Sequence, residues 1–146
     1  MMVLEKLSAD NLDLFTALTL EFWPDGDWDE EKEFYHQLMQ SDDDACFLLK
    51  DKEVGVAFIH VSTRHDYVEG SEKSPIAYLE GIFVKPNYRK SGWGKKLIHE
   101  AENWARMKGL IQLASDTPIS NTDSLLFHRN SGFREVERVV CLIKEL

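Results

Sequence analysis

Two cations and two glycines stand close together at residues 89–94, which read Arg-Lys-Ser-Gly-Trp-Gly. The apolar run before them, residues 77–84, predicts a buried strand, and apolar residues at helical spacing after them predict an amphipathic helix. A loop that enters a helix exposes unpaired backbone N–H groups at the positive end of the helix dipole, and glycine lets an anion approach the backbone. The stretch therefore predicts a phosphate-binding loop, with a glycine-rich helix start that binds nothing as the alternative.

Two carboxylates stand where chemistry is expected. Glu80 interrupts an otherwise apolar strand, where an unpaired charge would be costly, so it needs a partner or a cleft. Gly81 beside it indicates a bulge or a close backbone approach, and bulges cluster near active sites. Asp116 follows the short predicted strand 111–114, and ligands often bind at strand ends. The plainer alternatives are a salt bridge at the sheet end for Glu80 and a turn-forming aspartate for Asp116.

Two aromatic residues and the overall charge suggest the kind of ligand. Tyr67 lies in a polar loop, residues 63–74, that is long for a connection between strands, and Trp23 ends a predicted helix. Either ring would stack on a ligand or pack into the core. The net charge of −9 argues against a nucleic-acid partner and suits a cationic ligand, although it also fits plain solubility.

Other kinds of site lack their sequence signatures. The P-loop and the dinucleotide fingerprint are absent, and Ser115, Asp116 and His128 have triad residue types without a Gly-x-Ser-x-Gly elbow. The five histidines show no metal-ligand spacing, so we expect no metal. Cys46 and Cys141 lie in apolar runs and are expected to be buried thiols, with a disulfide left open. Without a signal peptide or an apolar run of membrane-span length, the chain is expected to be cytoplasmic.

The elements that position these residues form one expected domain, residues 1–146, of mixed α/β class. Hydrophobic periodicity and turn residues predict strands at 2–6, 45–50, 53–62, 78–84, 111–114 and 135–144. Helices are predicted at 10–23, at 29–40, from the glycine-containing loop to about Lys108, and from the capping-box residues 120–123 to about Gly132.

The order of these elements and the motif Arg-x-x-Gly-x-Gly resemble the GNAT N-acetyltransferase superfamily. Within it, the chain resembles the aminoglycoside 6′-N-acetyltransferases in stretches from the first helix to the last strand. The most specific are Arg-His-Asp-Tyr-Val-Glu-Gly at 64–70 and Leu-Glu-Gly-Ile at 79–82. The resemblance implies a central mixed sheet of about six to seven strands flanked by about four helices.

The resemblance also implies a cosubstrate, a substrate and a partner. Acetyl-CoA would be held, without a metal, by the strand, the phosphate loop and the next helix, at Ile82, Phe83, Val84, Arg89, Lys90, Ser91, Gly92, Trp93, Gly94, Lys95 and Asn121. The aminoglycoside would contact Trp23, Tyr67, Glu80, Asp116 and Glu137, because carboxylates pair with a polycation and aromatic rings cover its sugar faces. The family also implies a homodimer and, in a bacterium, drug resistance.

The implied reaction is direct acetyl transfer in a ternary complex. Glu80 or Asp116 would accept the proton of the 6′-ammonium, and backbone N–H groups near residues 82–84 would stabilise the oxyanion. Many GNAT enzymes place a tyrosine where this chain has His128, so either His128 is the acid for the CoA thiolate or the thiolate leaves without one. Two rival functions are a GNAT acetyltransferase for another small amine or polyamine and a non-catalytic, acyl-CoA-binding regulatory domain.

Overall fold

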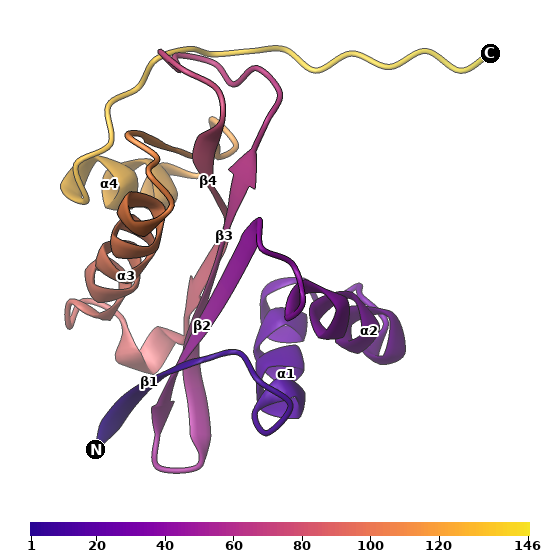
Figure 1. The fold of residues 1–146 in the computed structure, drawn as a ribbon, viewed down its shortest axis with the longest axis vertical. Helices are drawn as coiled ribbons and strands as arrows, with labels where there is room; N and C mark the ends of the chain where they lie inside the picture. The colour runs from indigo at the N-terminus through magenta and orange to yellow at the C-terminus, as the bar shows by residue number, and fades with distance from the viewer.

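The computed structural model describes residues 1–146 and contains one five-stranded sheet with helices on both faces (Figure 1). The strands are β1 (Met2–Lys6), β2 (Asp44–Asp51), β3 (Val54–Arg64), β4 (Ile76–Val84) and β5 (Leu113–Ala114). The helices are α1 (Leu12–Phe22), α2 (Trp28–Leu38), α3 (Trp93–Met107) and α4 (Thr122–Asn130), with a 3-10 turn, η1 (Pro86–Tyr88), between β4 and α3. The strands follow one another in sequence order, antiparallel except for the parallel pair β4 and β5.

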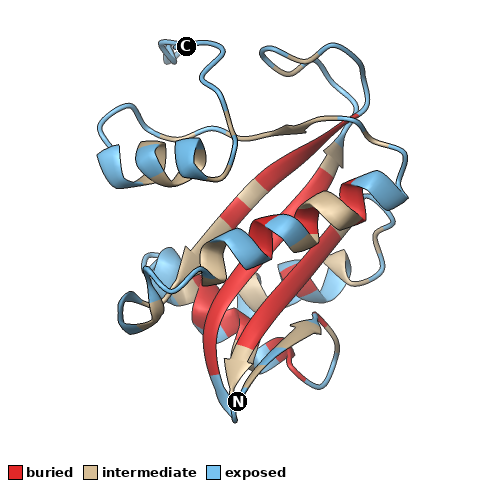
Figure 2. Cartoon of the chain, turned by 90° about the vertical axis from the view of Figure 1, so that its left-hand side faces the viewer, coloured by how far each residue is buried: buried red, intermediate tan, exposed pale blue.

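The alternation of side chains along β2 and β3 builds a core on each face of the sheet. Phe47 and Leu49 face α3, and their neighbours Cys46 and Leu48 face α1, as period-two patterning requires. The buried stripe of α3 is the one that its helical spacing predicts: Leu97, Ile98, Ala101, Trp104 and Ala105. Helices α1 and α2 therefore cover one face while α3 and α4 lie on the other, and Figure 2 shows the buried residues concentrated along the strands.

The predicted fold class is confirmed, but the sheet has five strands rather than six or seven. The predicted strand at 135–144 is wrong. After α4 the chain has no regular secondary structure, and Figure 1 shows its last residues running away from the body of the molecule. The predicted pattern is present, but a strand needs a neighbour for its backbone hydrogen bonds, and this segment has none within the chain.

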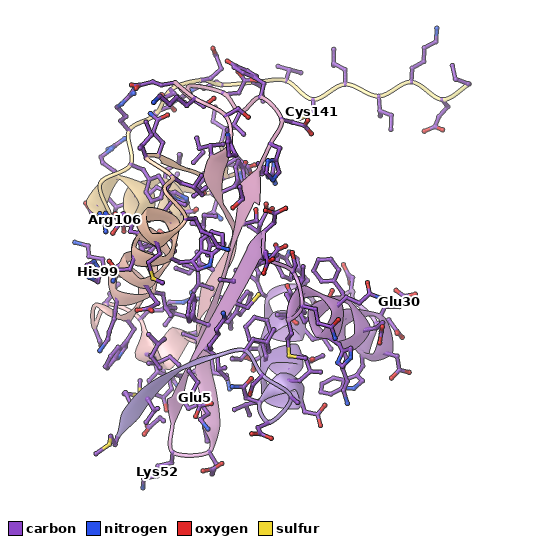
Figure 3. The ribbon with its side chains drawn as sticks, viewed as in Figure 1. Glu5, Glu30, Lys52, His99, Arg106 and Cys141 are labelled. Atoms are coloured by element: carbon purple, nitrogen blue, oxygen red, sulfur yellow. The ribbon has the colours of Figure 1, made fainter.

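The same segment overturns the expectation for one cysteine. Cys46 is buried in β2, but Cys141 is exposed on the extended C-terminal segment, where Figure 3 labels it. Both thiols are free, so the chain contains no disulfide. None of the helices has the length and apolar character needed to cross a membrane.

Candidate active site

Glu80 is the extra residue of a bulge in β4. The register pairs His60 with Gly81 and Val61 with Leu79, so Glu80 has no partner on β3. A bulge changes the direction in which a side chain points, and this one brings the Glu80 carboxylate to polar side chains at the end of β3. The bulge that Gly81 suggests is thereby confirmed.

Two side chains of β3 hold the Glu80 carboxylate. Arg64 donates from Nε to Oε2 at 2.9 Å and from Nη2 to Oε1 at 2.7 Å, and the Ser62 hydroxyl donates to Oε2 at 2.6 Å. The Arg64 contact is a bidentate ion pair, the geometry in which a guanidinium binds a carboxylate most strongly. Glu80 therefore makes the salt bridge that the sequence analysis gave as the plainer alternative. It does so beside the other predicted carboxylate, Asp116.

A second carboxylate joins the same row of side chains. The guanidinium carbon of Arg64 lies 3.5 Å from the centre of the Tyr78 ring, and the Tyr78 hydroxyl donates to Oδ2 of Asp116. Asp116 is exposed in the loop after β5 and makes no ion pair. We call Ser62, Arg64, Tyr78, Glu80 and Asp116 the carboxylate cluster. It brings the two predicted acidic residues together through two residues that the sequence analysis did not single out.

Charge and burial act in opposite directions on Glu80. Burial alone would raise its pKa, but the hydrogen bonds from Arg64 and Ser62 and the positive charge of Arg64 outweigh it and hold the pKa below its usual range. Burial and the hydrogen bond to Asp116 raise the pKa of Tyr78, so its hydroxyl stays protonated and remains a donor. Glu80 is thus an ionised carboxylate neutralised by Arg64, whereas Asp116 makes no ion pair.

The two predicted aromatic contacts lie differently. Trp23 follows α1 and reaches across to β4: a Cβ added at Gly81 would lie 3.0 Å from its ring, next to the bulge that carries Glu80. The Trp23 ring also packs on Phe22, with 4.4 Å between centroids, and remains 39% exposed. Tyr67 is 74% exposed in the β3–β4 loop, where its only polar contact is a 3.5 Å hydrogen bond to Glu69.

The predicted phosphate loop leads into α3 with its backbone donors free. Gly92 is the N-cap in a left-handed conformation, with φ +86°, and no side chain caps the helix. Lys90 is also left-handed, with φ +63°, and Gly94 is in close contact with Phe127 of α4. An uncapped helix start with adjacent cations fits an anionic group such as a pyrophosphate. Ser91 directly precedes Gly92, and Trp93 and Lys95 lie in the first turn of α3.

An open strand edge runs from this loop toward the carboxylate cluster. β5 pairs with β4 only at Ala77 and Tyr78, so beyond Tyr78 no strand lies beside the outer edge of β4. That edge includes the predicted residues Ile82, Phe83 and Val84. Arg89 donates from Nε to the Val84 carbonyl at 2.6 Å, which fixes the phosphate loop against the end of the strand. The diverging strands leave backbone groups available to a long, extended ligand.

His128 lies on α4 in contact with the β5 loop. Its Nε2 is 2.7 Å from the Ser115 hydroxyl, and its Nδ1 is 2.7 Å from the Ser124 carbonyl. Asn121 caps the same helix by accepting a 3.1 Å hydrogen bond from the Ser124 backbone N–H. Of the three residues with the types of a Ser-His-Asp triad, Ser115 and His128 are therefore paired, whereas Asp116 belongs to the carboxylate cluster.

Two predicted substrate contacts, Tyr67 and Glu137, make no hydrogen bond or ion pair with the carboxylate cluster. Glu137 is exposed on the C-terminal segment, and its one hydrogen bond is to the backbone N–H of Arg138, at 3.1 Å.

The sequence did carry a signal for the overlooked residues: His60, Ser62 and Arg64 stand at every second position of β3, separated by Val61 and Thr63, which places three polar side chains on one face. No group of three or more His, Cys, Asp or Glu side chains is arranged to hold a metal ion.

Comparison with known proteins matches residues 9–133 to the Acetyltransferase (GNAT) family. The chain belongs to this family. Aminoglycoside N(6')-acetyltransferase type 1 of Serratia marcescens is 40% identical over 138 residues, which are 94% of each chain. The structure of AAC(6')-Iy in complex with the bisubstrate analog CoA-S-monomethyl-acetylneamine has a TM-score of 0.95 at 35% identity, covering 100% of this chain and 99% of that chain. AAC(6')-Ih from Acinetobacter baumannii has a TM-score of 0.93 at 35% identity, with the same coverage.

Membership in the GNAT family confirms the predicted fold and the prediction of acetyl-CoA as cosubstrate. The resemblance to the aminoglycoside branch is confirmed by relatives of that name along nearly the whole chain. In this GNAT chain the uncapped start of α3 follows the open edge of β4, and Glu80 of the carboxylate cluster stands on the same strand. The roles of individual site residues remain predictions.

Proposed function

We propose that this protein is an aminoglycoside 6′-N-acetyltransferase that transfers the acetyl group of acetyl-CoA to the 6′-amine of an aminoglycoside. The observation that carries the proposal is the carboxylate cluster beside an open strand edge, in a chain whose full-length relatives are named for this activity. Carboxylates form ion pairs with a polycationic substrate. To accept a proton from the attacking amine, a carboxylate must lie close to the bound thioester. In a bacterium this reaction gives resistance to the drug.

The residues around α3 and β4 fit the cosubstrate. The backbone N–H groups that begin α3 and the cations Lys90 and Lys95 would bind the pyrophosphate. The open edge of β4 at residues 82–84 would bind the pantetheine arm, and Asn121 begins the neighbouring helix. When bound, acetyl-CoA supplies the activated acetyl thioester; every other group that the reaction needs comes from the protein or the amine.

Asp116 is the base that we propose for the amine. An ammonium is not nucleophilic until it loses a proton, and the acceptor must be a carboxylate that is free to take it. Arg64 and Ser62 already occupy both oxygens of Glu80 and lower its pKa, which makes Glu80 the weaker acceptor. Asp116 accepts one hydrogen bond, from Tyr78, and is exposed, so the amine reaches it directly or through one water.

The open edge of β4 would also stabilise the reacting carbonyl. Backbone N–H groups fixed in a strand are preorganised donors for the negative charge that develops on the thioester oxygen. Ser115 and His128 form a hydrogen-bonded pair. The leaving sulfur of CoA would receive its proton from this pair. The amine attacks the acetyl carbon directly, so the chain needs no covalent acetyl-enzyme.

We further propose that the protein works as a homodimer. The C-terminal segment exposes a series of apolar side chains, Val139, Val140, Leu142 and Ile143. At the end of the sheet, β5 has a free outer edge. A second copy of the chain would cover the apolar side chains and pair with the free edge. In a two-fold dimer the C-terminal segment of each copy lies along the other copy. Such a pairing would also bring Glu137 of one copy to the other.

The single domain and its location belong to the same proposal. We infer that residues 1–146 act as one acetyltransferase domain, because the sheet that binds the cosubstrate also carries the carboxylate cluster. We infer a cytoplasmic location, because free thiols such as Cys46 and Cys141 persist there.

A panel of amines tests the proposed function against its rivals. CoA release is measured with kanamycin, spermine, a monoamine and a peptide N-terminus, beside the variant Asp116→Asn. We expect turnover with kanamycin to exceed that with the other amines, and Asp116→Asn to lower kcat about 100-fold while acetyl-CoA still binds. Preference for spermine would support the polyamine rival, and CoA binding without an acetylated product from any amine would support the regulatory domain.

A further inference from the structure

Arg64 makes the contacts with Glu80 that a substrate ammonium would make. It donates to both carboxylate oxygens, at 2.7 and 2.9 Å, and Ser62 adds a third hydrogen bond, so three of the roughly four lone-pair sites of the carboxylate are taken and only one, on Oε1, is left for an incoming cation. The guanidinium also covers the Tyr78 ring, 3.5 Å from its centre, a surface that favours a cation. A cation of the protein itself thus occupies the best cation site of the carboxylate cluster.

The charges of the carboxylate cluster do not match a polycation while this contact persists. Glu80 and Arg64 cancel each other, which leaves the single negative charge of Asp116. One ammonium group of a substrate is able to pair with Asp116. A second ammonium group has no free carboxylate, because Glu80 is already neutralised, and it is repelled by the positive charge of Arg64. Like charges at this range disfavour binding in a partly desolvated site, so a second ammonium requires Arg64 to leave Glu80.

Arg64 is able to leave at small structural cost. It is the last residue of β3, it begins the long loop to β4, and its side chain is 42% exposed against 24% for Glu80. A swing of the side chain into water opens no cavity in either core cluster, because Arg64 belongs to neither. Ser62 stays in place under the carboxylate and keeps one of its hydrogen bonds.

We propose that Arg64 is an internal counter-ion that competes with the substrate for Glu80 and that an ammonium group of the bound substrate displaces it. The inference rests on the proposed function, since it assigns the second ammonium of that substrate to Glu80. Arg64 thereby sets the affinity for cationic substrates. A ligand with several ammonium groups displaces it readily, because Asp116 has already bound one of them and raised the effective concentration of the next.

Kinetics of Arg64 variants test the competition. Arg64→Met keeps the length of the side chain and removes its charge, and Arg64→Lys keeps the charge with a single donor centre. We expect Arg64→Met to lower the KM for kanamycin about fivefold, with the KM for acetyl-CoA unchanged, and Arg64→Lys to fall between Arg64→Met and wild type. In a Glu80→Gln background, Arg64→Met should have no effect on either KM. An unchanged or increased KM for kanamycin in Arg64→Met would overturn the proposal.

Nuclear magnetic resonance of the wild-type protein gives a readout that does not depend on turnover and uses a variant only to assign one signal. The Nε–H signal of Arg64 is identified as the arginine signal missing from Arg64→Lys, and kanamycin or spermine is then added. We expect protection from solvent exchange in the free protein and loss of that protection at saturation with either polycation. Persistent protection at saturation contradicts the proposal. Absence of kanamycin turnover in wild type would instead count against the proposed function and leaves this exchange test intact.

Discussion

The Ser115 hydroxyl and Nε2 of His128 lie 2.7 Å apart, and the other ring nitrogen decides which of them donates. Nδ1 lies 2.7 Å from the Ser124 carbonyl, which only accepts, so Nδ1 carries a hydrogen. In the neutral ring Nε2 is therefore the acceptor and Ser115 is the donor. His128 thus lies behind Ser115 rather than presenting its own proton to the leaving sulfur, and the pair acts as one unit when the ring is protonated.

The pair predicts matched kinetic effects for two variants. If Ser115 passes a proton from His128 to the sulfur, Ser115→Ala and His128→Ala each lower kcat about tenfold with little change in either KM. Because the two residues act in series, the double variant should be no slower than the slower single variant. Steady-state kinetics across pH measure this. Unchanged turnover of His128→Ala across pH would remove His128 from the mechanism, and unchanged turnover of both single variants would leave the thiolate to depart without an acid.

The ion pair of Glu80 predicts how stability depends on pH. Burial opposes ionisation, but Arg64 and Ser62 depress the folded-state pKa below 4.5, the value without such partners. A depressed pKa contributes stability above the unfolded-state value, and that contribution is lost as pH falls through the folded-state pKa. Glu80→Gln should therefore be less stable than wild type by about 1 kcal/mol at neutral pH, a modest value because Arg64 is well exposed.

The difference between Glu80→Gln and wild type should narrow as pH falls below 4.5. Urea denaturation at neutral pH and at an acidic pH measures it. Burial raises the pKa of Asp44, but hydrogen bonds from His60 and Ser41 hold it low. The contribution of Asp44 to the pH dependence of stability is the same in both proteins and cancels in the difference. A difference that stays constant over this range would contradict the account of the Glu80 pair.

Local signals in the sequence predict most of the fold. The continuous apolar runs of β2 and β3 reflect burial on both faces of the sheet, and the apolar stripe of α3 reflects burial on one face of the helix; a single segment of sequence already displays each pattern. The segment 135–144 carries the same kind of pattern but is no strand, because strand formation depends on a neighbour that the chain itself does not provide. The pattern shows what a segment is able to pair with, not whether a partner is present.

The candidate site was predictable only in part. Glu80 stands out because a charge in an apolar strand needs an explanation, and the phosphate loop stands out through its glycines. The contact between Arg64 and Glu80 was not predictable, because it depends on the register of β3 and β4 and on a bulge that shifts this register by one residue. The pairing of Ser115 with His128 likewise depends on how α4 packs beside β5, which spacing along the chain does not fix.

Two glycines at opposite ends of α3 allow a controlled test of the phosphate loop. Gly92 and Gly109 are both left-handed, and a Cβ at either one would meet nothing within 4 Å. Replacement by alanine should therefore cost each protein a similar 1–2 kcal/mol, roughly, for the left-handed backbone. Only Gly92→Ala should raise the KM for acetyl-CoA, by about tenfold, because its methyl group lies where the anion approaches. An equal change in that KM for Gly109→Ala would contradict the assignment.

The exposed C-terminal segment predicts that the oligomeric state depends on its apolar side chains. Leu142 is 89% exposed within one chain, and Met107, on α3, is 86% exposed. If a second copy covers the segment, Leu142→Asp weakens the dimer because it buries a charge, whereas Met107→Asp leaves the dimer intact. Light scattering coupled to size exclusion measures both variants. A wild-type protein that remains a monomer at high concentration would contradict the homodimer.

The most direct test of the central claim compares two aminoglycosides that differ at one position. CoA release from acetyl-CoA is measured with kanamycin or tobramycin and, in parallel, with an analogue that carries a hydroxyl at the 6′ position. We predict turnover with the 6′-amine and none with the 6′-hydroxyl analogue, which would establish both the reaction and its position on the substrate. Absence of turnover with either amine, while acetyl-CoA still binds, would preserve the GNAT fold and contradict the aminoglycoside function.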